Sequence, residues 1–239
     1  MDARFSSKSV GLSGVKLSGF LAVCLLASAI WLDEAAGRSL GLRENLTGPF
    51  VVGTLLSATA GFVALPILRR LKAAQFIRED GPKAHLKKAG TPTMGGIFFI
   101  PAAVLVALLW TGFSQAAVAV SVMTLAYGAI GWLDDWQVMR RRSNKGISPR
   151  MKLMLQIGCA IAFCSWTMAT QSAELTSVAI PFGLTLPLGF LFWPLAGFVL
   201  VAESNATNLT DGVDGLMGGA GAIALFGLGV LVAPTHPDL

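Results

Sequence analysis

Charged side chains are scarce in this sequence. Asp, Glu, Lys and Arg make up 13% of the 239 residues, whereas 54% are hydrophobic and the mean hydropathy is +0.68. Soluble globular domains carry roughly twice this share of charged residues. The composition therefore excludes an ordinary soluble enzyme and predicts an integral membrane protein, for which chain length does not indicate the number of domains.

Cysteine is rare as well. Cys24, Cys159 and Cys164 all lie inside apolar runs, and their spacing matches no metal-ligand pattern. We interpret them as small interior hydrophobic residues and expect no disulfide framework. The net charge of +5 would fit nucleic acid or anionic lipid. Because the basic residues are confined to loops between apolar runs, the pattern favours a membrane surface, and nucleic acid is not an expected partner.

Long apolar runs, by contrast, are abundant. A membrane-spanning helix needs about 20 apolar residues. The sequence predicts an all-α integral membrane protein, a polytopic helix bundle of about seven spans in a single domain over residues 1–239. The first run, Leu17–Leu32, is the weakest, but no clear signal-peptide cleavage site follows it, which favours a retained helix. Pro181 and Pro187 predict a loop before the sixth span. The predicted spans are approximately residues 17–32, 47–68, 94–111, 115–133, 153–171, 186–202 and 216–233.

The basic residues set the predicted orientation. No Lys or Arg lies beyond Lys152. Seven spans with the N-terminus inside place 16 of the 18 Lys and Arg residues on one face, which the positive-inside rule identifies as cytoplasmic. We therefore expect a multi-pass protein of the cell inner (plasma) membrane. Three connectors are expected on its cytoplasmic face: Arg69–Thr93, Asp134–Lys152 and Glu203–Asp214.

The second connector starts with two adjacent carboxylates, Asp134 and Asp135, which follow an uncharged run that begins at Ala89. Neighbouring residues on a helix point about 100° apart, so we expect the two acids to have different partners. Carboxylate oxygens suit Mg²⁺, which typically takes one or two of them together with substrate phosphates. The alternative is a helix end whose acids pair with Arg140–Arg142, and the two acids alone would favour that alternative.

The first connector joins a basic cluster to a rigid turn, Thr91–Gly96, of hydroxyl, proline and glycine residues. Lysine side chains and exposed backbone N–H groups at a helix start suit phosphate oxygens. A basic loop against anionic lipid headgroups explains the lysines better. It does not explain the turn, which restricts the backbone without adding a hydrophobic anchor.

The third connector carries Asn205, Asn208 and Asp211 at intervals of three residues, which places them roughly on one helix face. Their amide and carboxylate groups are able to bind base edges, ribose or a metal. Gly212 and Gly215 permit an abrupt turn back into the membrane, and the alternative is an ordinary polar hairpin loop. Lysines, carboxylates and amides on one membrane face together predict a site for a phosphorylated, Mg²⁺-bound substrate beside a lipid.

Four stretches on this face resemble the signatures of the phospho-N-acetylmuramoyl-pentapeptide transferase family, within the polyprenyl-phosphate sugar-1-phosphate transferase superfamily. The string Gly90–Gly96 is the most specific piece, because it distinguishes this family from relatives that transfer N-acetylglucosamine-1-phosphate. The resemblance runs from about Leu65 to Leu216 and leaves out Leu17–Leu32. The four stretches are Asp80–His85, Lys88–Gly96, Gly131–Asp135 and Asn205–Gly215.

The resemblance implies an activity. Members transfer phospho-N-acetylmuramoyl-pentapeptide from UDP to polyprenyl (undecaprenyl) phosphate, which releases UMP and forms lipid I for peptidoglycan biosynthesis. They require Mg²⁺, and their fold has ten membrane helices with the active site on the cytoplasmic face. The implied partners are UDP-N-acetylmuramoyl-pentapeptide, polyprenyl phosphate and membrane lipid, with a homodimer as one option for assembly.

The resemblance also implies roles for single residues. Asp134 matches the acid proposed to deprotonate the attacking lipid phosphate, and Asp135 matches a neighbour that activity needs. The implied metal ligands are Asp134, Asp135 and Asn208, and Asp211 is the best candidate for contacting the nucleoside. The implied substrate-binding residues are Lys88, Thr91, Thr93, Lys152, Asn205, Asn208, Asp211 and Asp214.

Two parts of the family pattern would lie beyond Leu239. One is an aspartate in a Met-Gly-Asp stretch, the family's firmest Mg²⁺ ligand, and the other is a histidine cluster. We therefore expect a C-terminally truncated sequence that is inactive by itself. Two alternatives stay open: a transferase of N-acetylglucosamine-1-phosphate to polyprenyl phosphate, and a non-catalytic membrane scaffold or transporter. Spans empty of charge count against a transporter, which needs ionisable groups near the middle of the membrane.

Overall fold

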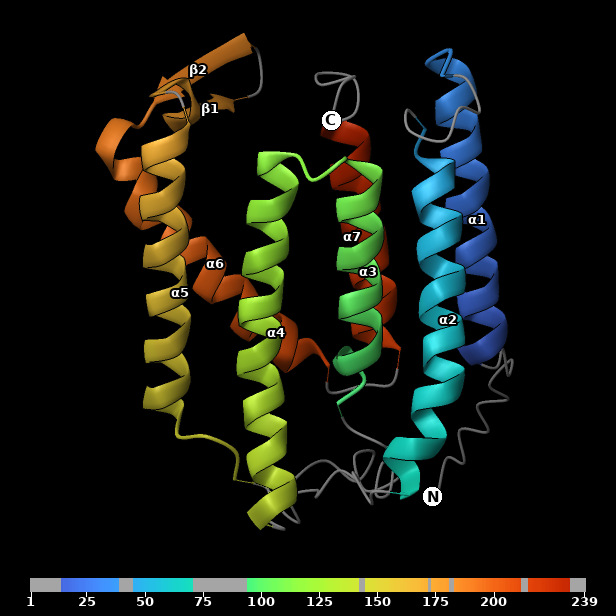
Figure 1. The fold of residues 1–239 in the computed structure, drawn as a ribbon. Coiled ribbons are helices and arrows are strands. Elements are labelled where there is room, and N and C mark those ends of the chain that lie inside the picture. Colours follow the sequence, from blue (N-terminus) through green and yellow to red (C-terminus); the bar gives the residue numbers. More distant parts are fainter. Residues whose placement is uncertain are drawn as a thin grey trace, which may run out of the picture. The chain divides into compact units, whose positions relative to one another are not determined.

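The computed structural model describes residues 14–38, 45–70, 94–141, 145–171, 173–180, 183–211 and 215–232. These residues form seven α-helices and one short β-hairpin (Figure 1), which confirms the predicted all-α membrane class. The chain divides into two compact units. We call Gly48–Gly212 the central unit, and Met1–Thr47 together with Val213–Leu239 the terminal unit.

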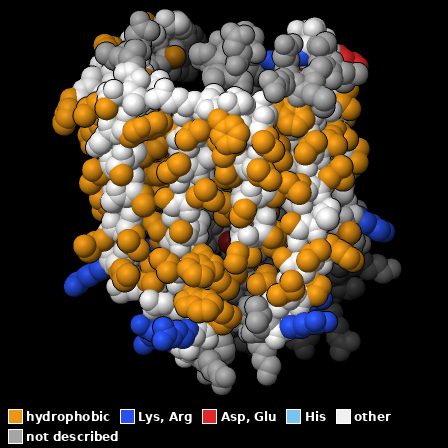
Figure 2. Space-filling model, viewed as in Figure 1, with side chains coloured by type: hydrophobic (Ala, Val, Ile, Leu, Met, Phe, Trp, Pro, Cys, Tyr) orange, Lys and Arg blue, Asp and Glu red, His pale blue; other side chains and the backbone are white. Residues whose placement is uncertain are grey.

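Apolar helices make up the central unit. In the described part of the chain, five helical segments are long and apolar enough to span a membrane: Gly14–Ala35 (α1), Thr47–Arg70 (α2), Gln115–Arg141 (α4), Pro149–Thr170 (α5) and Gly189–Thr210. Two further helices, Gly96–Trp110 (α3) and Leu216–Val232 (α7), are apolar but shorter. Figure 2 shows hydrophobic side chains along α4 and α5, with Lys and Arg side chains toward the end at which α4 finishes. The helices of the central unit are α2 (Thr47–Arg70), α3 (Gly96–Trp110), α4 (Gln115–Arg141), α5 (Pro149–Thr170) and α6 (Phe192–Thr210). The first residue of α2, Thr47, is assigned to the terminal unit.

A tight turn separates α3 from α4, at the boundary that the sequence predicts between two spans. The hydroxyl of Ser114 accepts the backbone N–H of Ala117 at 3.3 Å and so satisfies a free donor at the start of α4. The two helices then pack closely, since a Cβ atom on Gly128 would lie 3.3 Å from Ile100 Cδ1. A small residue at the contact lets membrane helices approach.

A cap determines where α5 begins. Ser148 Oγ accepts the N–H of Met151 at 3.2 Å. Pro149 occupies the first position of the helix, where a backbone N–H would have no partner within the helix, so proline costs no hydrogen bond there. This start places Lys152 in the first turn of α5.

A β-hairpin joins α5 to α6 in the region where the sequence predicts a loop. β1 (Ser177–Ile180) pairs antiparallel with β2 (Leu184–Pro187), and Gly183 provides a positive φ of 75° just before β2. Pro187 is the last residue of β2, at the end of the ladder, where a strand tolerates proline. Short 3₁₀ turns flank the hairpin at Ala173–Thr176 and Gly189–Leu191.

In the terminal unit, α1 (Gly14–Ala35) contacts α7 (Leu216–Val232). Gly219 lies close to α1, because a Cβ atom there would be 3.9 Å from Leu21 Cδ2. Gly215 takes a φ of 79° immediately before α7. That backbone angle suits glycine.

Near the end of α1, Asp33 is almost completely buried, with 3% of its surface exposed. Its Oδ1 accepts the N–H of Leu46 at 2.9 Å, and its Oδ2 accepts the N–H and the hydroxyl of Thr47 at 2.9 and 2.6 Å. The guanidinium of Arg38 lies 3.6 Å from Oδ1. Thr47 is the first residue of α2, so the carboxylate satisfies donors that a helix start leaves free.

Candidate active site

Asp134, in the last two turns of α4, receives partners from the connector and from α5. Its Oδ1 accepts the backbone N–H of Ile147 at 2.9 Å, and its Oδ2 lies 3.4 Å from Lys152 Nζ. The side chain of Asp134 is 26% exposed and that of Lys152 is 17% exposed. The carboxylate is thus held in place while part of it stays accessible.

Lys152 links this carboxylate to α6. Its ammonium group donates to Asn208 Oδ1 at 3.2 Å as well as to Asp134 Oδ2. Three predicted site residues from three different helices therefore meet around one positive charge. Hydrogen bonds in which a partner is ionised are stronger than neutral ones, so Lys152 draws α4, α5 and α6 together at this end.

Asp135 has a different hydrogen-bond donor, as expected for adjacent positions on a helix. The backbone N–H of Met94 donates to its carboxylate, and Asp135 also interacts electrostatically with Asp134, Lys152 and Asp211. Met94, just before α3, has a φ of 68°, a backbone angle uncommon for residues other than glycine. The start of α3 is therefore a fourth element at the site.

Beneath these charged groups lies a buried amide, Gln156, with 1% of its surface exposed. It donates to Ser204 Oγ at 3.0 Å, and its Oε1 accepts from Asn205 Nδ2 at 2.9 Å. Its backbone carbonyl accepts the Tyr127 hydroxyl at 3.0 Å. Gln156 is not among the site residues predicted from the sequence. The available signal was an isolated amide in an apolar span, one helical turn after Lys152, because a polar residue at membrane depth faces the protein interior.

The remaining predicted site residues fall into two groups. Asp211 follows the last residue of α6, and its N–H donates to the carbonyl of Thr207 at 3.2 Å. Asn205 contacts Gln156 and, through the same nitrogen, the carbonyl of Val201 at 2.8 Å. Four predicted residues lie outside the described part of the chain: Lys88, Thr91, Thr93 and Asp214.

The oxygen atoms at this site have the chemistry that Mg²⁺ prefers, namely carboxylate and amide oxygens. Within the described ranges, however, no group of three His, Cys, Asp or Glu side chains forms a metal cluster. Lys152 occupies one oxygen of Asp134 and the oxygen of Asn208. A cation bound to both of these residues would therefore compete with an ammonium group. Asp135 is repelled by the carboxylate of Asp134 and, more weakly, by that of Asp211.

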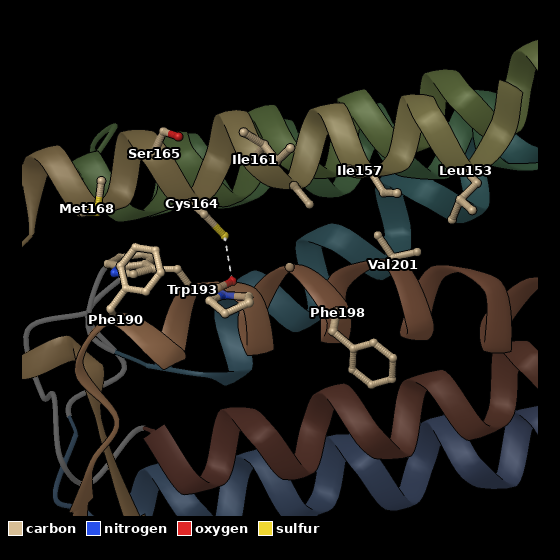
Figure 3. A pocket seen from close by; sticks show the side chains of 13 residues that line it. Leu153, Ile157, Ile161, Cys164, Ser165, Met168, Phe190, Trp193, Phe198 and Val201 are labelled. Carbon is tan, nitrogen blue, oxygen red and sulfur yellow. Dashed lines mark hydrogen bonds between the residues drawn. The ribbon is translucent and has the colours of Figure 1, made fainter. Parts of the chain in front are cut away.

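An apolar groove of about 670 Å³ runs between α5 and α6 (Figure 3). It is lined at one end by Leu153, which directly follows Lys152, and at the other by Met168 and Phe190. Along the groove, the thiol of Cys164 lies 3.9 Å from the carbonyl of Trp193. One end of the groove thus lies at the residue that follows Lys152 on α5.

Two family descriptions match this chain. Residues 117–237 match glycosyl transferase family 4, and residues 88–100 match phospho-N-acetylmuramoyl-pentapeptide-transferase signature 1. The first match covers the ends of α4, α5 and α6 that carry Asp134, Lys152 and Asn208. The second includes Lys88, Thr91 and Thr93.

Curated relatives named phospho-N-acetylmuramoyl-pentapeptide-transferase are similar over most or all of the chain. The protein of Nostoc sp. is 59% identical over 100% of this chain and 65% of its own length. That of Rippkaea orientalis is 61% identical over 82% of this chain and 54% of its own length, and that of Synechococcus elongatus is 54% identical over 92% and 61%. The Nostoc match includes Leu17–Leu32, so the expectation that the resemblance leaves this segment out was wrong.

Proposed function

This chain belongs to glycosyl transferase family 4, and from this membership and its likeness to the named relatives we propose that it is the larger part of a phospho-N-acetylmuramoyl-pentapeptide transferase. The proposed reaction moves phospho-N-acetylmuramoyl-pentapeptide from UDP to polyprenyl phosphate. An oxygen of the lipid phosphate attacks the sugar-linked phosphorus, the bond to UMP breaks, and lipid I forms. Because the chain spans 65% of the length of the Nostoc relative, we propose that the 239 residues alone are inactive.

The contact of Lys152 with both Asp134 and Asn208 is the observation that carries this proposal. Two anionic substrates must approach each other, so fixed positive charge is needed where negative charge develops. Lys152 supplies such a charge. Asp134 lies beside Lys152, and its side chain is partly exposed. Asp134 is the proposed acceptor of the lipid phosphate proton.

The apolar groove supports a lipid substrate. Leu153 at one end of the groove directly follows Lys152 on α5. A polyprenyl phosphate needs a charged site for its phosphate and apolar surface for its chain, and α5 and α6 offer both. We propose that the chain of the lipid lies along this groove, with its phosphate at Lys152.

Mg²⁺ is the proposed cofactor, which would supply further positive charge for the phosphate oxygens. Asp134, Asp135 and Asn208 were the ligands expected from the resemblance. Because Lys152 already engages Asp134 and Asn208, we assign the leading role to Asp135, with Asp211 as its neighbour. A dication between these two carboxylates would offset their repulsion.

The remaining assignments concern placement and partners. We propose that the Asp134 end of α4 faces the cytoplasm, that the N-terminus is inside, and that the protein lies in the inner (plasma) membrane. UDP-N-acetylmuramoyl-pentapeptide would be the donor, with a homodimer as one form of assembly. Signature 1 supports a role in substrate binding for Lys88, Thr91 and Thr93, and Asn205, Asp211 and Asp214 are the proposed contacts for the nucleotide part.

A hybrid transferase provides the test. We define it as the Nostoc relative in which the aligned 65% is replaced by this 239-residue chain. With polyprenyl phosphate and Mg²⁺, we expect UMP release and lipid product from UDP-N-acetylmuramoyl-pentapeptide and none from UDP-N-acetylglucosamine. The chain alone should form no product. If only UDP-N-acetylglucosamine gives product, the chain belongs to the alternative transferase of N-acetylglucosamine-1-phosphate. If neither donor gives product, the proposal is refuted.

A further inference from the structure

The connector between α4 and α5 approaches Asp134 unusually closely. The backbone N–H of Ile147 donates to Oδ1 at 2.9 Å. A Cβ atom built on the preceding residue, Gly146, would overlap Asp134 Oδ1, and it would lie 2.7 Å from Cγ and 3.1 Å from the backbone oxygen of Asp134. Real Cβ atoms essentially never come within 3.0 Å of another heavy atom. Only a glycine fits beside this carboxylate.

The requirement at Gly146 is steric. Its φ lies outside the positive range in which glycine is favoured, so a left-handed backbone is not the reason for a glycine here. Gly158 on α5 differs, because a Cβ atom there would have nothing within 4 Å. This glycine is a matched control for the chemical change from glycine to alanine.

The connector is also anchored on its other side. Ile147 is 7% exposed, so its buried side chain fixes the N–H that contacts Asp134. Ser148 then caps α5, and Lys152 in the first turn contacts the second carboxylate oxygen. Each oxygen of Asp134 thus receives one donor from a single short stretch of chain.

We propose that Gly146 and Ile147 form a backbone clamp that positions the Asp134 carboxylate for transfer. Gly146 provides the space, and Ile147 provides the hydrogen bond that fixes the rotation of the carboxylate. Both are positioning residues, because they act through Asp134. The proposal rests on the proposed function, in which Asp134 is the group that takes the proton.

The first test measures transfer by Gly146→Ala in the hybrid transferase. A displacement of a reacting group by about 1 Å can cost about a hundredfold in rate, so we expect kcat to fall about tenfold to hundredfold. KM for both substrates should stay at the parent value, since substrate contacts are not removed. Gly158→Ala should keep the parent kcat. Parent kcat in Gly146→Ala would overturn the proposal.

The second test does not depend on activity. Unfolding of the 239-residue chain is followed for Gly146→Ala with Asp134 present and in an Asp134→Ala background. We expect a clear loss of stability in the first case and a smaller loss in the second, because truncation of Asp134 leaves room for the new Cβ atom. Equal losses in both backgrounds would overturn the clamp. If the unmutated hybrid transferase shows no transfer, the proposed function fails, and this unfolding cycle alone decides whether the clamp exists.

Discussion

Asp33 in the terminal unit and Asp134 in the central unit are the same chemical group near the end of an apolar helix, yet the fold treats them differently. The Asp33 side chain is 4% exposed, and it accepts three hydrogen bonds from Leu46 and Thr47. The Asp134 side chain is 26% exposed and has one backbone donor and one lysine. The fold thus engages Asp33 fully and leaves part of Asp134 accessible.

The partners of the two acids explain the difference. Asp33 binds three donors at the start of the next helix, and the Arg38 guanidinium lies 3.6 Å from the same carboxylate. Asp134 shares its lysine with Asn208 on another helix, so its environment includes a positive charge that an anionic substrate could also use. Exposure, rather than the presence of a carboxylate or of a nearby cation, thus distinguishes the proposed reacting group from the structural one.

Removal of the shared cation should have a large effect on transfer. Lys152→Met in the hybrid transferase keeps the length of the side chain but removes its charge, so we expect kcat to fall about a hundredfold, as for the loss of one electrostatic contact to a transition state. Arg150→Met, an exposed cation in the same turn, should behave as the parent. If the two substitutions lower kcat equally, the net charge of the site matters and the specific contact of Lys152 with Asp134 does not.

Removal of the buried amide should affect stability more than chemistry. Gln156→Leu leaves Ser204 without its donor and Asn205 with one partner fewer. We expect a loss of about 1–3 kcal/mol in the free energy of unfolding of the chain, the usual cost of unmade buried hydrogen bonds. The drop in transfer should be smaller than that of Lys152→Met. Gln171→Leu, at an exposed position after α5, is the control and should unfold like the parent.

Neutralising Asp33 should have the smallest effect on transfer. Asp33→Asn weakens the contacts to Leu46, Thr47 and Arg38, so we expect the chain to lose about 1–3 kcal/mol of stability. Transfer per folded hybrid transferase should equal the parent value. Glu34→Gln, its exposed neighbour, should change neither quantity. If Asp33→Asn lowers transfer per folded hybrid transferase, Asp33 also contributes to transfer and the contrast between the two acids is wrong.

The sequence predicts the helical class and much of the site for identifiable reasons. Apolar runs indicate membrane helices because few other structures satisfy the backbone in lipid. Asp134, Lys152 and Asn208 were predicted to share one face of the membrane, because charge placement orients the spans, and the structure brings them into contact. The different partners of Asp134 and Asp135 follow from helix geometry alone.

Other features need the folded chain. Gln156 is a single polar residue in an apolar run, and no pattern states that it would meet Ser204 and Asn205 from another helix. Gly146 is one of 27 glycines, and its closeness to Asp134 depends on the path of the connector. The hairpin replaced the expected loop because prolines mark the ends of strands as well as breaks in helices.

The most direct measurement of the central claim compares Asp134→Asn with the parent hybrid transferase in both transfer and unfolding. Asparagine keeps the size of the side chain and an oxygen for the N–H of Ile147, but it cannot take a proton at neutral pH. We expect kcat to fall by a factor of about 10²–10⁴, the usual contribution of general acid–base catalysis, while unfolding changes little. A variant that retains the parent kcat would contradict the assignment of Asp134 as the reacting carboxylate.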